Sequence, residues 1–287
     1  MDATTIITQI FLPISLAIIM FGMGLTLVVS DFSRLFTYPK EVFIGLCNQL
    51  IFLPLIGFLI ILLFDLNSTM ATGIMILSLC PGGPTSNLIT QVARGNIGLS
   101  VTLTALASLI TVFTIPIILS KAITYFTGET DVVIELPVLQ TMIQILIITV
   151  IPVSIGMLIR NKNEAFAVRM ERPMRIASTV LFIIIFLLVM FANKDLIVQA
   201  MKEVGFATLL LNLSTMASGY ITAKFFGIKG KSQISITIES GIQNGTLAFV
   251  IATTILNNVE MGLPTGAYSI WMFITGGILM WRLGVSK

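Results

Sequence analysis

Long apolar runs, separated by short polar segments, follow one another along almost the whole chain. Nine of these runs approach the roughly 20 apolar residues that a membrane-spanning helix needs, so the pattern predicts an all-α polytopic membrane protein. The predicted spans are 6–29, 41–64, 69–93, 97–120, 136–159, 174–193, 205–223, 232–256 and 265–281. No soluble domain fits between them, and residues 1–287 are expected to form a single membrane unit.

Composition supports this prediction and excludes several kinds of chemistry. Hydrophobic residues make up 56% of the 287 residues and charged residues only 10%, against about 25% charged in soluble domains. The chain has no histidine, which excludes histidine catalysis and histidine metal ligation. Cys47 and Cys80 lie inside apolar runs and predict neither a disulfide nor a thiolate metal site. The net charge of +3 gives no signal for nucleic-acid binding.

The distribution of basic residues predicts the orientation in the membrane. If the N-terminus lies outside, 13 of the 16 Lys and Arg residues fall on the inner side. The exceptions are Lys121, Lys194 and Lys202. Inner loops of membrane proteins are rich in Lys and Arg, so the N-terminus is expected outside and the C-terminus in the cytoplasm. The segment before the first span has no basic residue, and this span is expected to be retained rather than cleaved as a signal.

Two of the predicted spans are interrupted by polar and helix-breaking residues. The third contains Pro81-Gly82-Gly83-Pro84, and the eighth contains the polar, glycine-punctuated run 239–245. If spans 1–4 start outside and spans 6–9 start inside, the third span of each group is the broken one. A simple kink would explain the first break alone, but matching breaks in two groups of opposite orientation predict an inverted repeat with the transport site at the breaks.

Glu239 is the acidic residue inside a predicted span. An ionisable group within the bilayer costs about 2.5–3.5 kcal/mol on insertion scales, so it is expected to face a polar cavity and to be functional rather than a neutral structural acid. At a broken helix, free carbonyl groups suit a small cation and free amide groups suit an anion. Ser86 and Asn87 are expected to cap the second half of the third span.

The polar side chains near the two breaks carry only oxygen ligands. They are Gln49, Ser86, Asn87, Ser100, Thr104, Glu239, Gln243 and Asn244. Such a set favours an alkali cation over zinc or copper. Taken alone, Ser100, Thr104 and Gln49 are more typical of residues that hydrogen-bond between helices than of ion ligands.

Three ordered motifs resemble those of the bile acid:sodium symporter family. They are C-P-G-G-P-T-S-N-L-I-T-Q-V-A-R-G-N-I-G-L-S-V from Cys80, I-E-S-G-I-Q-N-G from Ile238 and M-F-G-M-G-L-T-L-V-V-S-D-F from Met20. The resemblance implies a sodium-coupled symporter of organic anions that needs no cofactor other than Na⁺, in the plasma (inner) membrane of a bacterium. It carries no signal for an oligomeric state.

The resemblance also implies the site residues. A first sodium ion would be held by Ser86, Asn87, Ser100, Thr104 and Glu239. A second would be held by Gln49, Glu239 and Gln243, with backbone carbonyls of Ser240 and Ile242. The anion would lie near Thr85, Asn244, Gly245, Met272 and Phe273. A core domain at about 41–120 and 205–281 would move against a panel domain at about 6–29, 136–159 and 174–193.

The sequence departs from the family pattern at three places. The better-known bacterial relatives have ten spans, and the first is expected to be missing here, which leaves the fifth predicted span without a partner. Met272 and Phe273 stand where some relatives have polar residues, which favours a small carboxylate over a large bile acid. Pro84 replaces a small or hydroxyl residue after Gly82-Gly83.

Two other function classes compete with this interpretation. A proton-coupled or uniport carrier of organic anions on the same scaffold would use Glu239 for a proton, but it would not need the other oxygen ligands. An intramembrane hydrolase would need a base beside a serine nucleophile, and Glu239 is the sole candidate. The chain is therefore expected to be a transporter and not an enzyme.

Overall fold

The computed structural model describes residues 7–128, 136–170 and 194–284, with a few positions between 172 and 184. The regular elements in these ranges are all helices, apart from one isolated β-bridge between Gly82 and Gln243. The prediction of an all-α protein is confirmed for this part of the chain.

The helices follow the order of the predicted spans. They are α2 (Leu12–Gly24), α3 (Val29–Thr37), α4 (Pro39–Cys47), α5 (Leu53–Leu63), α6 (Ser68–Leu79), α7 (Pro84–Val92), α8 (Ile97–Thr127), α9 (Val138–Ile145), α10 (Ile151–Lys162), α12 (Lys194–Phe225), α13 (Lys231–Gly241), α14 (Gly245–Val250) and α15 (Leu263–Gly284). A 3₁₀ turn, Glu260–Gly262, precedes α15.

Five helical segments in the described ranges are long and apolar enough to cross a membrane. They are Pro39–Leu63, Ile97–Thr127, Val138–Lys162, Met201–Phe225 and Glu260–Gly284. A bent pair, Gln9–Gly24 and Val29–Thr37, meets at 66° and would count as a sixth. Two shorter apolar helices, Ser68–Leu79 and Gly245–Ile255, fall in the interrupted spans. The predicted span at 174–193 lies almost entirely outside the described residues.

Two helices are longer than the predicted spans that they contain. The helix α8 continues to Thr127, beyond the predicted end at 120, and α12 begins at Lys194, well before 205. Hydropathy reports only the apolar part of a helix, and the extensions contain polar residues such as Lys121 and Glu203.

Four π-helical turns widen the long helices, at Ile7–Phe11, Asn48–Phe52, Leu146–Val150 and Ile251–Ile255. The first three come just before Pro13, Pro54 and Pro152. Proline lacks an N–H group and its ring clashes with the carbonyl four residues earlier, so a widened turn lets the helix continue past it.

The turn Asn48–Phe52 also places two adjacent polar residues inside the protein. Asn48 and Gln49 are 1% and 5% exposed. Asn48 bonds to α12, where its Nδ2 donates to Thr222 Oγ1 at 2.8 Å and its Oδ1 accepts from Ser218 Oγ at 2.8 Å. Gln49 faces the two breaks instead.

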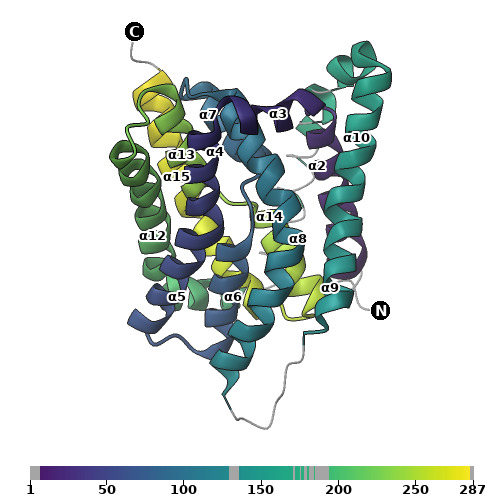
Figure 1. Ribbon diagram of the computed structural model, residues 1–287. Helices are drawn as coiled ribbons and strands as arrows, with labels where there is room; N and C mark the ends of the chain where they lie inside the picture. The colour runs from purple at the N-terminus through teal and green to yellow at the C-terminus, as the bar shows by residue number, and fades with distance from the viewer. Residues whose placement is uncertain are drawn as a thin grey trace.

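Figure 1 shows α3 lying across one end of the bundle, between α8 and the pair α2 and α10. The Asp31 carboxylate accepts from the Val28 N–H at 2.8 Å and pairs with Arg34. The Asp31 carbonyl accepts from Thr102 Oγ1 of α8 at 2.8 Å. These bonds fix the sharp turn after α2 and attach α3 to the start of α8.

The helices α2 and α10 pack through glycine with their backbones in contact. A Cβ atom on Gly24 would lie 2.2 Å from the Val153 carbonyl oxygen, and one on Gly156 would lie 2.5 Å from that of Phe21. No larger residue fits at either position. Small residues allow helices to approach closely where lipid removes the hydrophobic drive for association.

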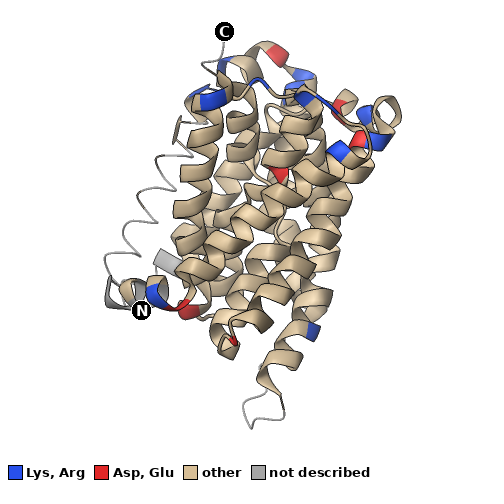
Figure 2. Cartoon of the chain, turned by 90° about the vertical axis from the view of Figure 1, so that its left-hand side faces the viewer, with Lys and Arg blue, Asp and Glu red and all other residues tan. Residues whose placement is uncertain are grey.

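The outer surface of the bundle is apolar along its middle and charged at its ends. Large apolar side chains are exposed on several helices, for example Leu55, Leu59, Phe113 and Ile117. Figure 2 shows that most of the Lys and Arg residues gather at the end where α15 finishes. An apolar belt between polar ends is the surface expected of a protein that spans a bilayer.

Candidate ion and substrate site

Two broken helices meet in the middle of the bundle. One break lies between α6 and α7, and the other lies between α13 and α14. Gly82 and Gln243 form an antiparallel bridge, and the Asn244 N–H donates to the Pro81 carbonyl at 2.8 Å. Backbone groups released by each break are thus partly satisfied by the other, as non-helical backbone at membrane depth requires.

The Glu239 carboxylate lies beside this crossing and is 4% exposed. Its Oε1 accepts a short hydrogen bond from Ser100 Oγ, and its Oε2 accepts from Thr104 Oγ1 at 2.9 Å. Asn87 Oδ1 lies 2.8 Å from Ser100 Oγ and 3.4 Å from Thr104 Oγ1. Side-chain oxygen atoms of Asn87, Ser100, Thr104 and Glu239 therefore lie within hydrogen-bonding distance of one another, and such a group of oxygen atoms suits a bound cation.

Ser86 completes this group from the start of α7. Its hydroxyl is fully buried and donates to the Gly83 carbonyl at 2.7 Å. A Cβ atom on Gly82 would lie 3.3 Å from Ser86 Oγ and 2.5 Å from Glu239 Oε2. The five residues expected around the first ion are therefore brought together, and glycine at 82 leaves room for the carboxylate.

The residues expected around the second ion are also neighbours. Gln49 Nε2 donates to the Cys80 carbonyl and to Gln243 Oε1, both at 2.7 Å. Gln243 Nε2 in turn donates to the Ser240 carbonyl at 3.0 Å. Ile242, which lies between Ser240 and Gln243 in the chain, is fully buried.

Gln49 carries an oxygen atom that the protein leaves unsatisfied. Its Oε1 is buried and has no hydrogen-bond partner among the described residues. The amide cannot be turned around, because its NH₂ group faces the Cys80 carbonyl, which can only accept. A buried acceptor without a donor costs about 1–3 kcal/mol, and a cation would remove this cost.

The residues expected around the anion divide into two groups. Thr85 is half-buried at the start of α7, and Asn244 and Gly245 lie at the start of α14. A Cβ atom on Gly245 would lie 3.1 Å from Ser269 Oγ. Met272 is 3% exposed, whereas Phe273 is 49% exposed. Only Met272 of that pair points into the protein.

One sequence prediction about the breaks is wrong. Ser86 and Asn87 do not cap α7, because Gly83 is the N-cap residue and makes no side-chain capping bond. Pro84 occupies the first helical turn, where its missing N–H group costs nothing. The side-chain cap is at the other break, where Asn244 Oδ1 accepts from the Leu247 N–H at 3.0 Å.

Sequence reasoning also missed residues that support the site. Thr90 Oγ1 lies 3.3 Å from Ser100 Oγ, the hydroxyl that donates to the Glu239 carboxylate. Asn212 and Tyr268 both donate to the carbonyl of Gly241, the last residue of α13. Asn212 interrupts the apolar run L-L-L-N-L in the seventh predicted span, and this single polar position was the available signal.

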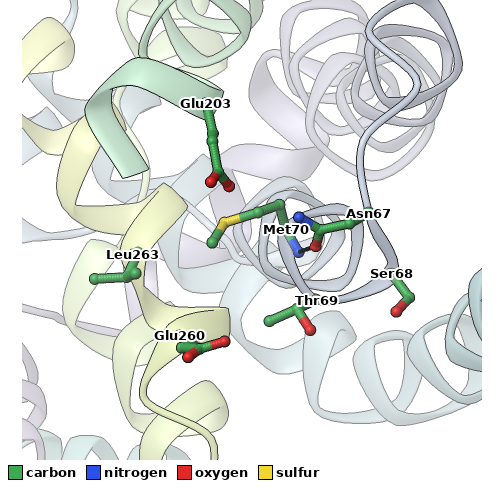
Figure 3. Close-up of a pocket in the computed structure, with 7 residues that line it drawn as sticks. All are labelled: Asn67, Ser68, Thr69, Met70, Glu203, Glu260 and Leu263. Carbon is green, nitrogen blue, oxygen red and sulfur yellow. Dashed lines mark hydrogen bonds between the residues drawn. The ribbon is translucent and has the colours of Figure 1, made fainter. Parts of the chain in front are cut away.

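A separate pocket of about 280 Å³ lies away from the crossing, at the ends of α6 and α15 (Figure 3). Glu203 of α12 and Glu260 of the 3₁₀ turn face it, together with Asn67, Ser68 and Thr69. Asn67 has a structural task there, because its Oδ1 caps α6 by accepting from the Met70 N–H at 3.0 Å.

Comparison with known proteins identifies the family. Residues 13–200 match the model of the sodium bile acid symporter family. The chain is 30% identical over 277 residues to the Arabidopsis thaliana protein named "Probable sodium/metabolite cotransporter BASS1, chloroplastic", covering 96% of this chain and 67% of that relative. It is 29% identical to the sodium-dependent transporter YocS of Bacillus subtilis, covering 96% of this chain and 84% of the relative.

The match to a mammalian relative covers a smaller share of that relative's length. The mouse protein named sodium/bile acid cotransporter 4 is 28% identical over 85% of this chain, which corresponds to 55% of that relative. These relatives are named as transporters, and the matched family model covers the first break and the helices around it. The chain is therefore a multi-pass membrane transporter rather than an enzyme, and it belongs to the sodium bile acid symporter family.

Proposed function

We propose that the protein is a symporter that uses sodium to drive uptake of a small organic anion. The observation that carries this proposal is the Glu239 carboxylate, buried at the crossing and surrounded by hydroxyl and amide oxygens. The names of its relatives, sodium/metabolite and sodium/bile acid cotransporters, support the same class of activity.

Two sodium ions would bind at the crossing, and both would use Glu239. The first would lie among the side-chain oxygen atoms of Ser86, Asn87, Ser100, Thr104 and Glu239. The second would lie near Gln49, Glu239 and Gln243 and the carbonyls of Ser240 and Ile242, and it would satisfy the free Gln49 Oε1. No other cofactor is needed, because the driving force comes from the ion gradient.

The anion would bind at the amide ends of the broken helices. The start of α14, at Asn244 and Gly245, supplies the positive end of a helix dipole. Thr85 at the start of α7 would add a hydroxyl group. The buried, apolar Met272 leaves little polar surface for a large hydroxylated substrate, which favours a small carboxylate.

The architecture would be that of an alternating-access transporter with nine spans in inverted repeats. A core domain, at about 41–120 and 205–281, would carry the crossing and move against a panel that contains α2 and α10. Direct glycine contacts between α2 and α10 support a panel that moves as one body. The charge distribution in Figure 2 supports a cytoplasmic C-terminus and an external N-terminus in the plasma (inner) membrane.

Sodium-dependent thermal stability of the purified protein tests the ion sites directly. A ligand that binds only the folded state stabilises it by about 1.4 kcal/mol at ten times its Kd and about 2.7 kcal/mol at a hundred times. We expect stabilisation by sodium but not by potassium in the wild type, and none in Glu239→Gln. Glu164→Gln is the matched control, because this acid is 77% exposed.

Uptake of labelled anions into proteoliposomes then tests coupling. A sodium gradient should drive uptake in the wild type and not in Glu239→Gln. Uptake that follows a pH gradient and ignores sodium would contradict the proposal and favour a proton-coupled carrier on the same scaffold.

A further inference from the structure

The two breaks are opened by different means. A continuous helix between α6 and α7 would need residue 84 to donate its N–H to the Cys80 carbonyl. Residue 84 is proline and has no N–H, so this bond cannot form. The sequence between α13 and α14 contains no proline, and the Gly245 N–H could donate to the Gly241 carbonyl. Something else must therefore keep the second break open.

The Gly241 carbonyl is occupied by two side chains from neighbouring helices. Asn212 Nδ2 of α12 and Tyr268 OH of α15 each donate to it at 2.8 Å. Both side chains are fully buried. A carbonyl oxygen has two lone pairs, and these two donors fill them. The Gly245 N–H turns to the Gln243 carbonyl instead, at 2.9 Å.

A third residue fixes the orientation of this arrangement. Thr275 Oγ1 of α15 lies 2.8 Å from Asn212 Oδ1, which leaves the Asn212 NH₂ group directed at Gly241. Thr275 Oγ1 also lies 3.0 Å from the Trp271 carbonyl of its own helix, so its single hydrogen is shared between these acceptors.

We propose that Asn212 and Tyr268 are positioning residues that hold the second break open and so set the sodium affinity of the crossing. This inference rests on the proposed function. Glu239 lies two residues before the occupied carbonyl and Gln243 two residues after it. If the break closed into a helix, Gln243 would rotate away from Gln49. The residues of the two proposed ion sites would then no longer lie side by side.

Three variants test this inference. Tyr268→Phe removes one hydroxyl group, and Asn212→Leu removes the other donor while keeping the number of side-chain heavy atoms. Trp271→Phe is the matched control, because Trp271 Nε1 of α15 donates to the Gly205 carbonyl of α12 at 2.8 Å, between the same two helices but away from the break.

The first readout is hydrogen exchange of the purified, sodium-free protein. We expect amides in the segment 239–247 to exchange at least fivefold more slowly in Tyr268→Phe and Asn212→Leu than in the wild type, because closure of the break gives them helical partners. Exchange in 79–86, where proline enforces the break, should stay unchanged, and Trp271→Phe should change neither segment. Unchanged or faster exchange in both Tyr268→Phe and Asn212→Leu, or an equal decrease in Trp271→Phe, would overturn the inference.

The second readout is the sodium concentration that gives half of the thermal stabilisation. This concentration should rise at least tenfold in Tyr268→Phe and Asn212→Leu and less than twofold in Trp271→Phe. All three variants should lose stability in the absence of sodium. A purely structural role would lower stability in all three and leave the sodium affinity alone. If the wild type shows no sodium response, the proposed function fails. The exchange experiment still decides whether Asn212 and Tyr268 hold the second break open.

Discussion

The two helix breaks at the centre of this transporter occupy corresponding places in the fold, but different interactions maintain them. The break between α6 and α7 is built into the covalent chain by Pro81 and Pro84. The break between α13 and α14 has no proline, and it relies on Asn212, Tyr268 and the Asn244 cap. A break made by proline is present before the protein folds, whereas one made by side chains exists only once α12 and α15 are in place.

The largest effect is expected from a methyl group at the first break. In Gly82→Ala the new Cβ would lie 2.5 Å from Glu239 Oε2, so the carboxylate must move away from Ser100 and Thr104. Overpacking of this kind costs about 1–3 kcal/mol, or about a 5- to 150-fold loss of sodium affinity. Titration of thermal stability with sodium measures it.

The neighbouring glycine provides a strict control. A Cβ on Gly83 would meet Asn244 at 3.5 Å, which is an ordinary contact. Gly83→Ala should therefore bind sodium within threefold of the wild type. Equal losses in both variants would show that the break tolerates no side chain at all, and that Glu239 is not the cause.

A smaller loss is expected when the link between the breaks is cut. Gln49 joins the Cys80 carbonyl to Gln243, and Gln49→Leu removes both bonds together with the free Oε1. We expect about a tenfold loss of sodium affinity, consistent with about 1–3 kcal/mol for buried groups left unpaired. The Hill coefficient for sodium should fall toward one, since only the first proposed ion would remain.

Gln233→Leu serves as the comparison for that experiment. The Gln233 amide of α13 donates to the Tyr220 carbonyl at 3.3 Å, in an exposed hydrogen bond. Its removal should leave both affinity and cooperativity unchanged. An unchanged Hill coefficient in Gln49→Leu would contradict the second ion site.

A third effect separates the caps of the two breaks. Asn244→Ala removes the side-chain cap of α14, which should lower the free energy of unfolding by about 1 kcal/mol. Asn67→Ala removes the equivalent cap of α6 and should cost a similar amount. Sodium-driven anion uptake should fall only in Asn244→Ala, because Asn67 lies at the end of α6 opposite to the crossing. Equal uptake in both variants would argue against anion binding at α14.

The smallest effect is expected from the proline itself. Pro84→Ala restores an N–H group at residue 84, but the Cys80 carbonyl is already bonded to Gln49. Stability should fall by about 0.4–1 kcal/mol through the unfolded chain, with sodium affinity within threefold of the wild type. Hydrogen exchange should increase in 79–86 and not in 239–247. A tenfold loss of affinity would show that Gln49 cannot hold the first break by itself.

The same difference explains how much of the protein could be predicted from its sequence. Apolar runs, the proline-rich break and the lone Glu239 are local signals, and they led to the all-α membrane fold and to the residues now found together at the crossing. The capping prediction failed because Pro84 starts α7 directly after Gly83. Asn212 and Tyr268 could not be assigned, because their partner lies 29 and 27 residues away in the chain.

The π-helical turn Asn48–Phe52 has a consequence for how this helix can change in evolution. It lets Asn48 hydrogen-bond to α12 while Gln49 hydrogen-bonds to residues of the crossing. Deletion of one residue within a helix rotates everything beyond it by about 100°. A deletion here would turn Gly57 away from Ser78, against which only glycine fits. An insertion or deletion of one residue in this turn would therefore change which face of the helix each later residue occupies. Homologues that differ by one residue here should also differ in the residue opposite position 57.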